Sequence, residues 1–138
     1  MRAFAALLLL SACASVFTPA PDERLAGCWI ERSGAVATTM RWFASPQQPG
    51  SMSGDLLRYG GGSEAPLGQQ YTLAPVDDGW RLCRTGDQAI CWPVAQGRSG
   101  SLEGGLAFID RYGERLRISV VDGTGETELF DGGRDGCD

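Results

Sequence analysis

The sequence predicts an all-β protein, a small antiparallel up-and-down β-barrel of about eight to nine strands. Short runs rich in β-branched and aromatic residues recur along the chain, with Gly, Pro and Asp turn signals about every 8–12 residues. Several runs alternate between apolar and polar residues, as half-buried strands do. Beyond residue 12, apolar residues do not recur with the helical period of about 3.6. Because short turns join consecutive runs, a barrel of sequential hairpins is favoured over a sandwich.

The first four strands are separated by recognisable loop signals. They are expected over residues 25–31, 36–43, 52–59 and 70–76. The intervening signals are a Pro-bounded loop at 45–50, a Gly-rich loop at 60–68 and an Asp-Asp-Gly turn at 77–79. Each strand is therefore bounded by residues that favour a reversal of the chain.

The clearest hairpin joins residues 80–84 to residues 89–94. A three-residue loop at 86–88 places Leu82 opposite Trp92, so that this apolar pair faces the core. A slip of one residue would turn both side chains to the solvent, because side chains alternate between the faces of a strand. The register of this hairpin is therefore well determined.

The same register predicts a disulfide. It places Cys83 opposite Cys91 on the face away from the core. Four cysteines beyond position 13 allow three pairings; we favour Cys83–Cys91, which leaves Cys28–Cys137 to fasten the first strand to the C-terminal tail. Pro93 lies in this hairpin and indicates an edge strand or a bulge, because it lacks a backbone N–H.

The last third of the chain predicts three more strands. They are expected over residues 102–109, 115–120 and 127–130. Residues 122–125 (Asp-Gly-Thr-Gly) form a hairpin turn signal between the last two. The Gly- and Asp-rich residues 131–138 are expected to form an irregular tail.

The N-terminus has the pattern of an export signal. Residues 1–12 combine an early Arg with an apolar run that is too short to span a bilayer. The run ends in Leu10-Ser11-Ala12-Cys13, which resembles the lipobox of bacterial lipoproteins. That resemblance implies that residues 1–12 are removed and that Cys13 carries acyl chains such as palmitate. Ordinary signal cleavage with an incidental Cys13 is the alternative.

The resemblance also implies a location. Residue Ala14 follows the cysteine where an Asp would indicate inner-membrane retention in Gram-negative bacteria, so an outer-membrane lipoprotein facing the periplasm is expected. Residues 13–24 then form the lipidated cysteine and an extended tether with two prolines. Residues 25–138 form the barrel domain.

Composition narrows the classes of function. The formal net charge is −5, which argues against nucleic acid as a partner, and the chain contains no His. The absence of His removes the most common general base and most zinc sites. We expect no catalytic residues, no metal site and no cofactor.

A second resemblance concerns the start of the domain. Gly27-Cys28-Trp29 resembles the Gly-x-Trp opening of lipocalin-like (calycin) barrels, in which the Trp plugs the base of the barrel. The stretch from Trp42 to Arg58 is similar to an uncharacterised family of small exported bacterial proteins of lipocalin-like shape. The chain lacks the later lipocalin motifs, which argues against a large ligand cavity.

The resemblance leads to two expectations about function. A small hydrophobic or amphiphilic ligand would lie in a pocket, with Arg58 as a polar contact. The expected lining residues are Trp42, Met52, Leu56, Arg58, Trp80, Trp92 and Phe108. The alternative is a filled core in a protein-interaction module, such as an inhibitor or an envelope-assembly factor, that binds an envelope protein through loops 45–50 and 60–68.

The lipobox makes a direct prediction about the mature N-terminus. In a Gram-negative host, mass spectrometry of the N-terminal peptide should show an acylated Cys13. A Cys13→Ser variant should lose the acyl mass and the membrane attachment. A free amine and a free thiol at Cys13 in the parent protein would contradict the anchor.

Overall fold

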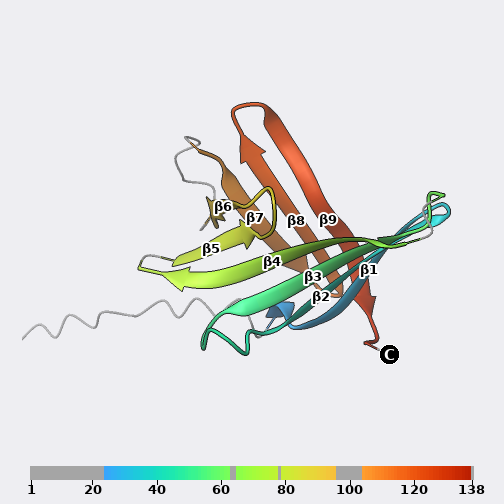
Figure 1. Ribbon diagram of the computed structural model, residues 1–138, viewed down its shortest axis with the longest axis horizontal. Coiled ribbons are helices and arrows are strands. Elements are labelled where there is room, and N and C mark those ends of the chain that lie inside the picture. Colours follow the sequence, from blue (N-terminus) through green and yellow to red (C-terminus); the bar gives the residue numbers. More distant parts are fainter. Residues whose placement is uncertain (1–23, 63–64, 78, 96–103, 138) are drawn as a thin grey trace, which may run out of the picture.

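A computed structural model describes residues 24–62, 65–77, 79–95 and 104–137. The expected signal segment at 1–12, Cys13 and the tether before residue 24 lie outside these residues. The described chain forms a single sheet of nine strands that curls into a nearly closed barrel (Figure 1). The all-β, up-and-down barrel predicted from the sequence is therefore confirmed.

The strands follow one another in chain order, and the longest connection, residues 94–105, lies between β6 and β7. They are β1 (Gly27–Ser33), β2 (Val36–Ala44), β3 (Met52–Tyr59), β4 (Leu67–Val76), β5 (Gly79–Arg84), β6 (Ile90–Pro93), β7 (Leu106–Tyr112), β8 (Arg115–Asp122) and β9 (Gly125–Asp135). Their order in the sheet is β6-β5-β4-β3-β2-β1-β9-β8-β7. We call the end where β1 starts and β9 ends the base. The other end, which carries the β1–β2, β3–β4 and β5–β6 turns, is the mouth.

The barrel closes between β6 and β7, in the middle of the chain. The first and last strands, β1 and β9, are instead hydrogen-bonded neighbours. A ring of nine strands has an odd number of members, so one neighbouring pair must be parallel when all the others are antiparallel. That pair is β6 and β7, joined by a parallel bridge between Val94 and Ala107 and by a 2.8 Å hydrogen bond from the Ala95 N–H to the Ala107 carbonyl.

Several strand bounds differ from the sequence expectation, most of all those of β4, which begins at Leu67 inside the expected Gly-rich loop, and those of β7 and β9. The expected C-terminal tail is in fact the end of β9, which runs to Asp135. A Cβ on Gly132 would lie 2.5 Å from the Ile30 carbonyl oxygen, so the glycine that resembled a tail is what lets β9 approach β1. β7 begins later than expected, at Leu106, because Gly104 and Gly105 have φ angles of 84° and 88°, outside the strand region.

The barrel interior is packed with large apolar side chains. Its fully buried members include Trp29, Met40, Leu73, Leu82, Leu116, Ile118 and Phe130. One close contact explains a glycine inside β3. A Cβ on Gly54 would lie 2.8 Å from the ring of Trp42, so only glycine leaves room for that indole.

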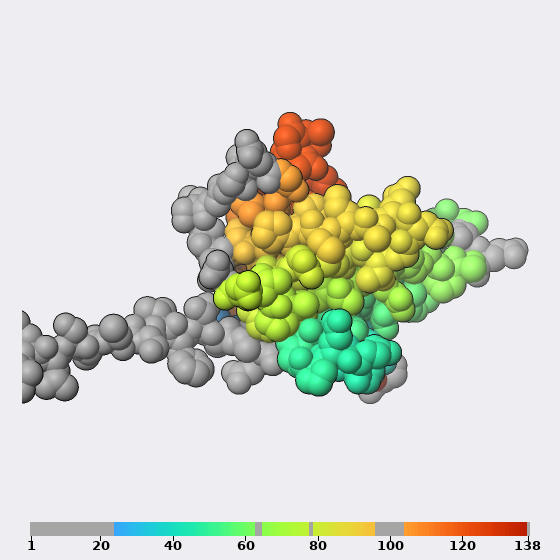
Figure 2. All heavy atoms as spheres, turned by 60° about the vertical axis from the view of Figure 1, so that its left-hand side comes forward, coloured from blue at the N-terminus to red at the C-terminus, as the bar shows by residue number. Residues whose placement is uncertain are grey.

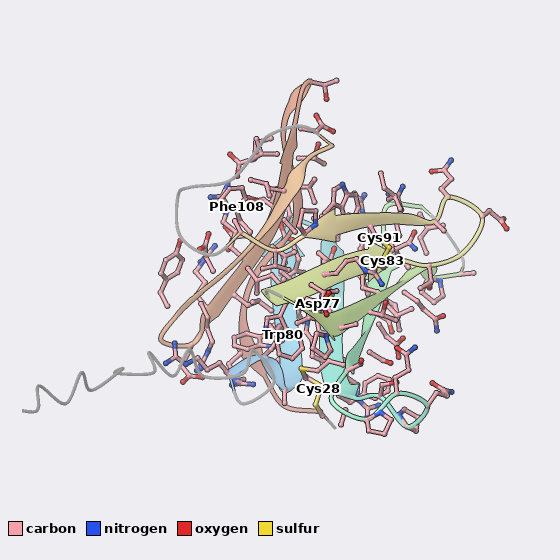
Figure 3. All side chains as sticks on the ribbon, turned by 90° about the vertical axis from the view of Figure 1, so that its left-hand side faces the viewer. Cys28, Asp77, Trp80, Cys83, Cys91 and Phe108 are labelled. Carbon is pink, nitrogen blue, oxygen red and sulfur yellow. A yellow bond between two sulfur atoms is a disulfide. The ribbon has the colours of Figure 1, made fainter. Side chains whose placement is uncertain are left out.

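Both expected disulfides are present. Leu82 pairs with Trp92, and Cys83 pairs with and is bonded to Cys91 across β5 and β6, as the hairpin register predicted (Figure 3). Cys28 is bonded to Cys137. Pro93 lies in β6, the last strand of the sheet order, which has a regular ladder on its β5 side only. A proline is tolerated in such an edge strand although it has no backbone N–H.

The two disulfides should contribute unequally to stability. Their cysteines are 109 and 8 residues apart, and a longer closed loop restricts the unfolded chain more. We expect a Cys28→Ser/Cys137→Ser variant to lose about 5 kcal/mol and a Cys83→Ser/Cys91→Ser variant about 2–3 kcal/mol. Urea unfolding of the two double variants measures both losses. Equal losses, or a larger loss for the short loop, would contradict this account.

Candidate functional site

The base of the barrel is closed by a tryptophan under an arginine. Trp29 is fully buried, and the guanidinium carbon of Arg134 lies 4.1 Å from its ring centroid. Arg134 also donates a 2.7 Å hydrogen bond from Nη1 to the Ala26 carbonyl. Gly27 has a φ of 124°, and a Cβ there would overlap the Arg134 guanidinium. The base is therefore a packed structural end, and access to the barrel has to be sought elsewhere.

Most of the residues expected to line a pocket belong to the packed core. Trp42, Met52 and Trp92 are each at most 6% exposed and lie in one contiguous apolar cluster. Trp80 is half-buried and packs against the same cluster. The Nε1–H of Trp42 has no hydrogen-bond partner among the described residues. These four side chains fill the space that a deep ligand would need.

Phe108 lies on the other face of its strand. Ala107 and Ile109, on either side of it, contact the core, and strand geometry then turns Phe108 the other way. It pairs with Ser119 and is well separated from Trp80 in Figure 3. The sequence could not reveal this, because residues 106–109 are all apolar and do not alternate.

Leu56 and Arg58 lie at the mouth, where the structure has a hollow of about 360 Å³. Its lining residues are Glu31, Ser33, Val36, Thr38, Leu56, Arg58, Glu128, Leu129 and Phe130. The members from β1, β2 and β3 occur at every second position and share the inner face with Trp29 and Met40. The hollow therefore opens on the barrel interior, above the packed core.

The charged groups of the mouth are unequally paired. Glu128 accepts a 3.2 Å hydrogen bond from the Nε of Arg117, which also contacts Glu126 at 2.8 Å. Glu31 and Arg58, by contrast, make no ion pair or hydrogen bond with any residue that the structure describes. The mouth thus presents one carboxylate and one guanidinium to any molecule that enters.

Sequence reasoning missed the residues of the mouth for two different reasons. Glu31 continues the alternation that starts at Trp29 and could have been placed on the inner face. Glu128 could not be placed, because β9 has a bulge at Leu129: a period of two counted from the core residue Phe130 would put Glu128 on the inner face, whereas it pairs with Ser119 on the outer face, beside Arg117. The extra residue shifts the register between Phe130 and Glu128 and breaks the period of two.

A larger and more open hollow of about 770 Å³ lies beside the β5–β6 loop. Its lining includes Asp55, Leu56, Gln69, Gln70 and Asp87, so it is mainly polar. In the part of the chain that the structure describes, no three acidic or Cys side chains approach closely enough to hold a metal ion. The described residues also contain no helix with the length and apolarity needed to cross a bilayer.

Comparison with protein-family models, with curated proteins and with solved structures finds no match to this chain. Its own residues and geometry are what point to a function. They show a packed barrel with a closed base, a charged and partly apolar mouth, and two disulfides.

Burial inside the barrel sets the behaviour of one tyrosine. Desolvation raises the pKa of Tyr71 above its ordinary value, and the positive charge of its cross-strand neighbour Arg84 lowers it in part. The folded state therefore holds the phenol proton more tightly than the unfolded state. This contribution to stability is present below the ordinary tyrosine pKa and is lost as the pH rises through the folded value.

We expect absorbance at 295 nm to show Tyr71 ionising above the ordinary tyrosine pKa. The stability of the parent protein should fall more steeply above about pH 10 than that of a Tyr71→Phe variant. Urea unfolding at pH 8 and at pH 10.5 measures the difference. Identical pH dependence in the two proteins would rule out burial as the cause.

Proposed function

We propose that this chain is an exported protein-interaction module, anchored to the outer membrane through Cys13 and facing the periplasm. The barrel core serves as a rigid scaffold, and the mouth is the surface that contacts a protein of the envelope. The two disulfides support export, because such bonds persist in oxidising compartments. The lipobox-like Leu10-Ser11-Ala12-Cys13 supports the anchor.

The packed interior is the observation that carries this proposal. In a carrier, Trp42, Met52 and Trp92 would line the ligand pocket. Here all three are buried members of one packed apolar cluster. A carrier of hydrophobic molecules needs a concave cavity that covers most of its ligand. A filled barrel of this size leaves its surface as the means of recognition.

Among the described residues, exposed large apolar side chains are more numerous at the mouth than at the base, where Val76 and Tyr112 stand. Tyr59, Leu67 and Ile90 stand at the mouth ends of β3, β4 and β6, with exposed fractions of 43%, 64% and 42%. Loops 45–50 and 60–68 were expected to act together. They lie at opposite ends of β3, and Figure 2 shows the blue-green β2–β3 loop well apart from the green β3–β4 end. Only the second loop belongs to the mouth.

A small amphiphile is the second candidate occupant of the mouth. The 360 Å³ hollow has apolar walls at Leu56 and Phe130 and the guanidinium of Arg58 beside them. That arrangement would suit a short apolar chain with an anionic end. The small volume and the open position favour a protein contact over a carried ligand.

Site-specific cross-linking separates the two ends of the barrel. A photoreactive benzoylphenylalanine at Leu67 or Ile90, expressed in the native envelope, should give an adduct of one discrete mass. The same group at Val76 or Tyr112, which are exposed but distant from the mouth, should give none. Adducts from all four positions, or from none, would contradict a contact at the mouth.

A fatty-acid titration distinguishes the second candidate. Tryptophan emission should stay unchanged with oleate, because Trp29, Trp42 and Trp92 are buried and Trp80 does not line the mouth hollow. Two results together would contradict the protein contact and support amphiphile binding. They are a saturable change in emission that disappears in an Arg58→Gln variant, and the absence of cross-linked adducts.

A further inference from the structure

The outer face of β2 and β3 carries apolar and charged side chains next to one another. Met40 and Trp42 of β2 point into the core, so their neighbours along the strand face outwards. β2 and β3 lie side by side, with β1 and β4 on their flanks (Figure 1). A hollow of about 320 Å³ lies on this face, and its outward-facing members from the two strands are Thr39, Arg41, Asp55, Leu57 and Tyr59. The hollow therefore offers apolar and ionic contacts together.

The outward-facing residues of the two strands, which we call the β2–β3 face, form four cross-strand rows. In one row Arg41 lies opposite Asp55. Each other row joins a small residue to a large one, namely Ala37 with Tyr59, Thr39 with Leu57, and Ser53 with Phe43. The face is therefore complementary to itself, because a rotation that exchanges β2 with β3 puts each residue on its complement.

The two charges in the middle of this face have no ionic partner in the described chain. Arg41 and Asp55 are cross-strand neighbours, yet neither forms an ion pair with a described residue. The guanidinium carbon of Arg41 lies 5.5 Å from the ring centroid of Phe43. Asp55 accepts a 3.4 Å hydrogen bond from the amide of Gln70. Both charges therefore remain available to a second molecule.

A two-fold axis parallel to the strands, between β2 and β3, makes use of this complementarity. It places β2 of one copy over β3 of the other, as in two sheets packed face to face about 10 Å apart. Arg41 of each copy then meets Asp55 of the other. On the flank, β1 of each copy lies over β4 of the other. Arg32 of β1 meets no like charge there, because β4 contains no charged residue.

The balance of charge favours a second copy over an unrelated protein. The described charged groups on and beside the face are Arg32, Arg41, Asp55 and Asp135, two of each sign. The face is thus neutral although the chain has a formal net charge of −5, so two copies can meet here without net repulsion. An unrelated partner would not require four rows that match one another across the ladder.

We propose that the β2–β3 face packs against the same face of a second copy in a symmetric dimer. Two reciprocal contacts between Arg41 and Asp55 flank the axis, and Leu57 of each copy packs over Thr39 of the other. Because the axis runs along the strands, both mouths point the same way, as in two chains anchored to one membrane. The dimer needs no contact at the mouth and is therefore independent of a partner bound there.

Sedimentation equilibrium of the purified, oxidised protein tests the dimer. The parent protein should show a concentration-dependent equilibrium between monomer and dimer. Arg41→Asp and Asp55→Arg should each weaken the dimer at least about tenfold, because like charges then face each other across the axis. An equimolar mixture of the two variants should recover the parent affinity as a heterodimer, since each ionic contact in it joins an Asp to an Arg. This recovery would also show that both variants are folded.

Arg81→Asp is the matched control. Arg81 is exposed on the outer side of β5, two strands away from β3, and makes no ion pair with a described residue. Its charge reversal should leave the dimer unchanged. A parent protein that stays monomeric at every concentration, or a dimer that both single reversals leave intact, would overturn the proposal. A mixture of the two variants that stays monomeric would overturn it as well.

Photocross-linking in the native envelope separates a second copy from any other occupant of the face. Benzoylphenylalanine in place of Phe43 should give an adduct of twice the mass of the chain. An adduct of another mass would assign the face to a different protein and overturn the dimer, as would the absence of an adduct. Adducts from Leu67 and Ile90 report on the mouth separately. If they persist while the dimer fails, only the dimer is overturned, and a dimer without them overturns only the contact at the mouth.

Discussion

The short ladder between β1 and β9 is the constraint on which the barrel depends. It contains only three residue pairs, yet it joins the six strands from β6 to β1 to the three strands β9, β8 and β7, and so makes the one nine-stranded sheet that the β6–β7 contact closes. Such a short ladder is marginal by itself, because two-stranded contacts in water are weak. Its neighbours compensate: Arg134 covers Trp29, and the Cys28–Cys137 disulfide holds the end of β9 on β1.

Glycines make this closure sterically feasible. Gly27 leaves space for the guanidinium of Arg134, and Gly132 lets the backbone of β9 approach the Ile30 carbonyl. Each position would clash with any larger residue. The same ladder ends abruptly at Ile30 because the β8–β9 hairpin turns away, which leaves β9 paired on one side only. The closed base and the open wall are thus two consequences of a single short contact.

The packed interior and the mouth have different chemistry for a physical reason. Deep positions receive side chains from all sides of the barrel, so large apolar groups such as Trp42 fill the space and exclude water. Towards the mouth the strands diverge, and the inner face of β1 changes from Trp29 to Glu31 and Ser33. Charged side chains are tolerated there because they remain hydrated.

Local patterns were sufficient for the fold class and for the β5–β6 hairpin. A short loop ties Cys83 to Cys91, and alternation of Leu82 and Trp92 with polar neighbours leaves one register. Long-range contacts decided the rest. The face on which Phe108 lies depends on the pairing of β7 with β8. The length of β9 depends on its approach to β1, and the face on which Glu128 lies depends on the bulge at Leu129. Apolar and polar residues do not alternate in the apolar run 106–109, in the Gly-rich residues 131–138 or at the bulge. Only the partner strand therefore determines which face or strand these residues join.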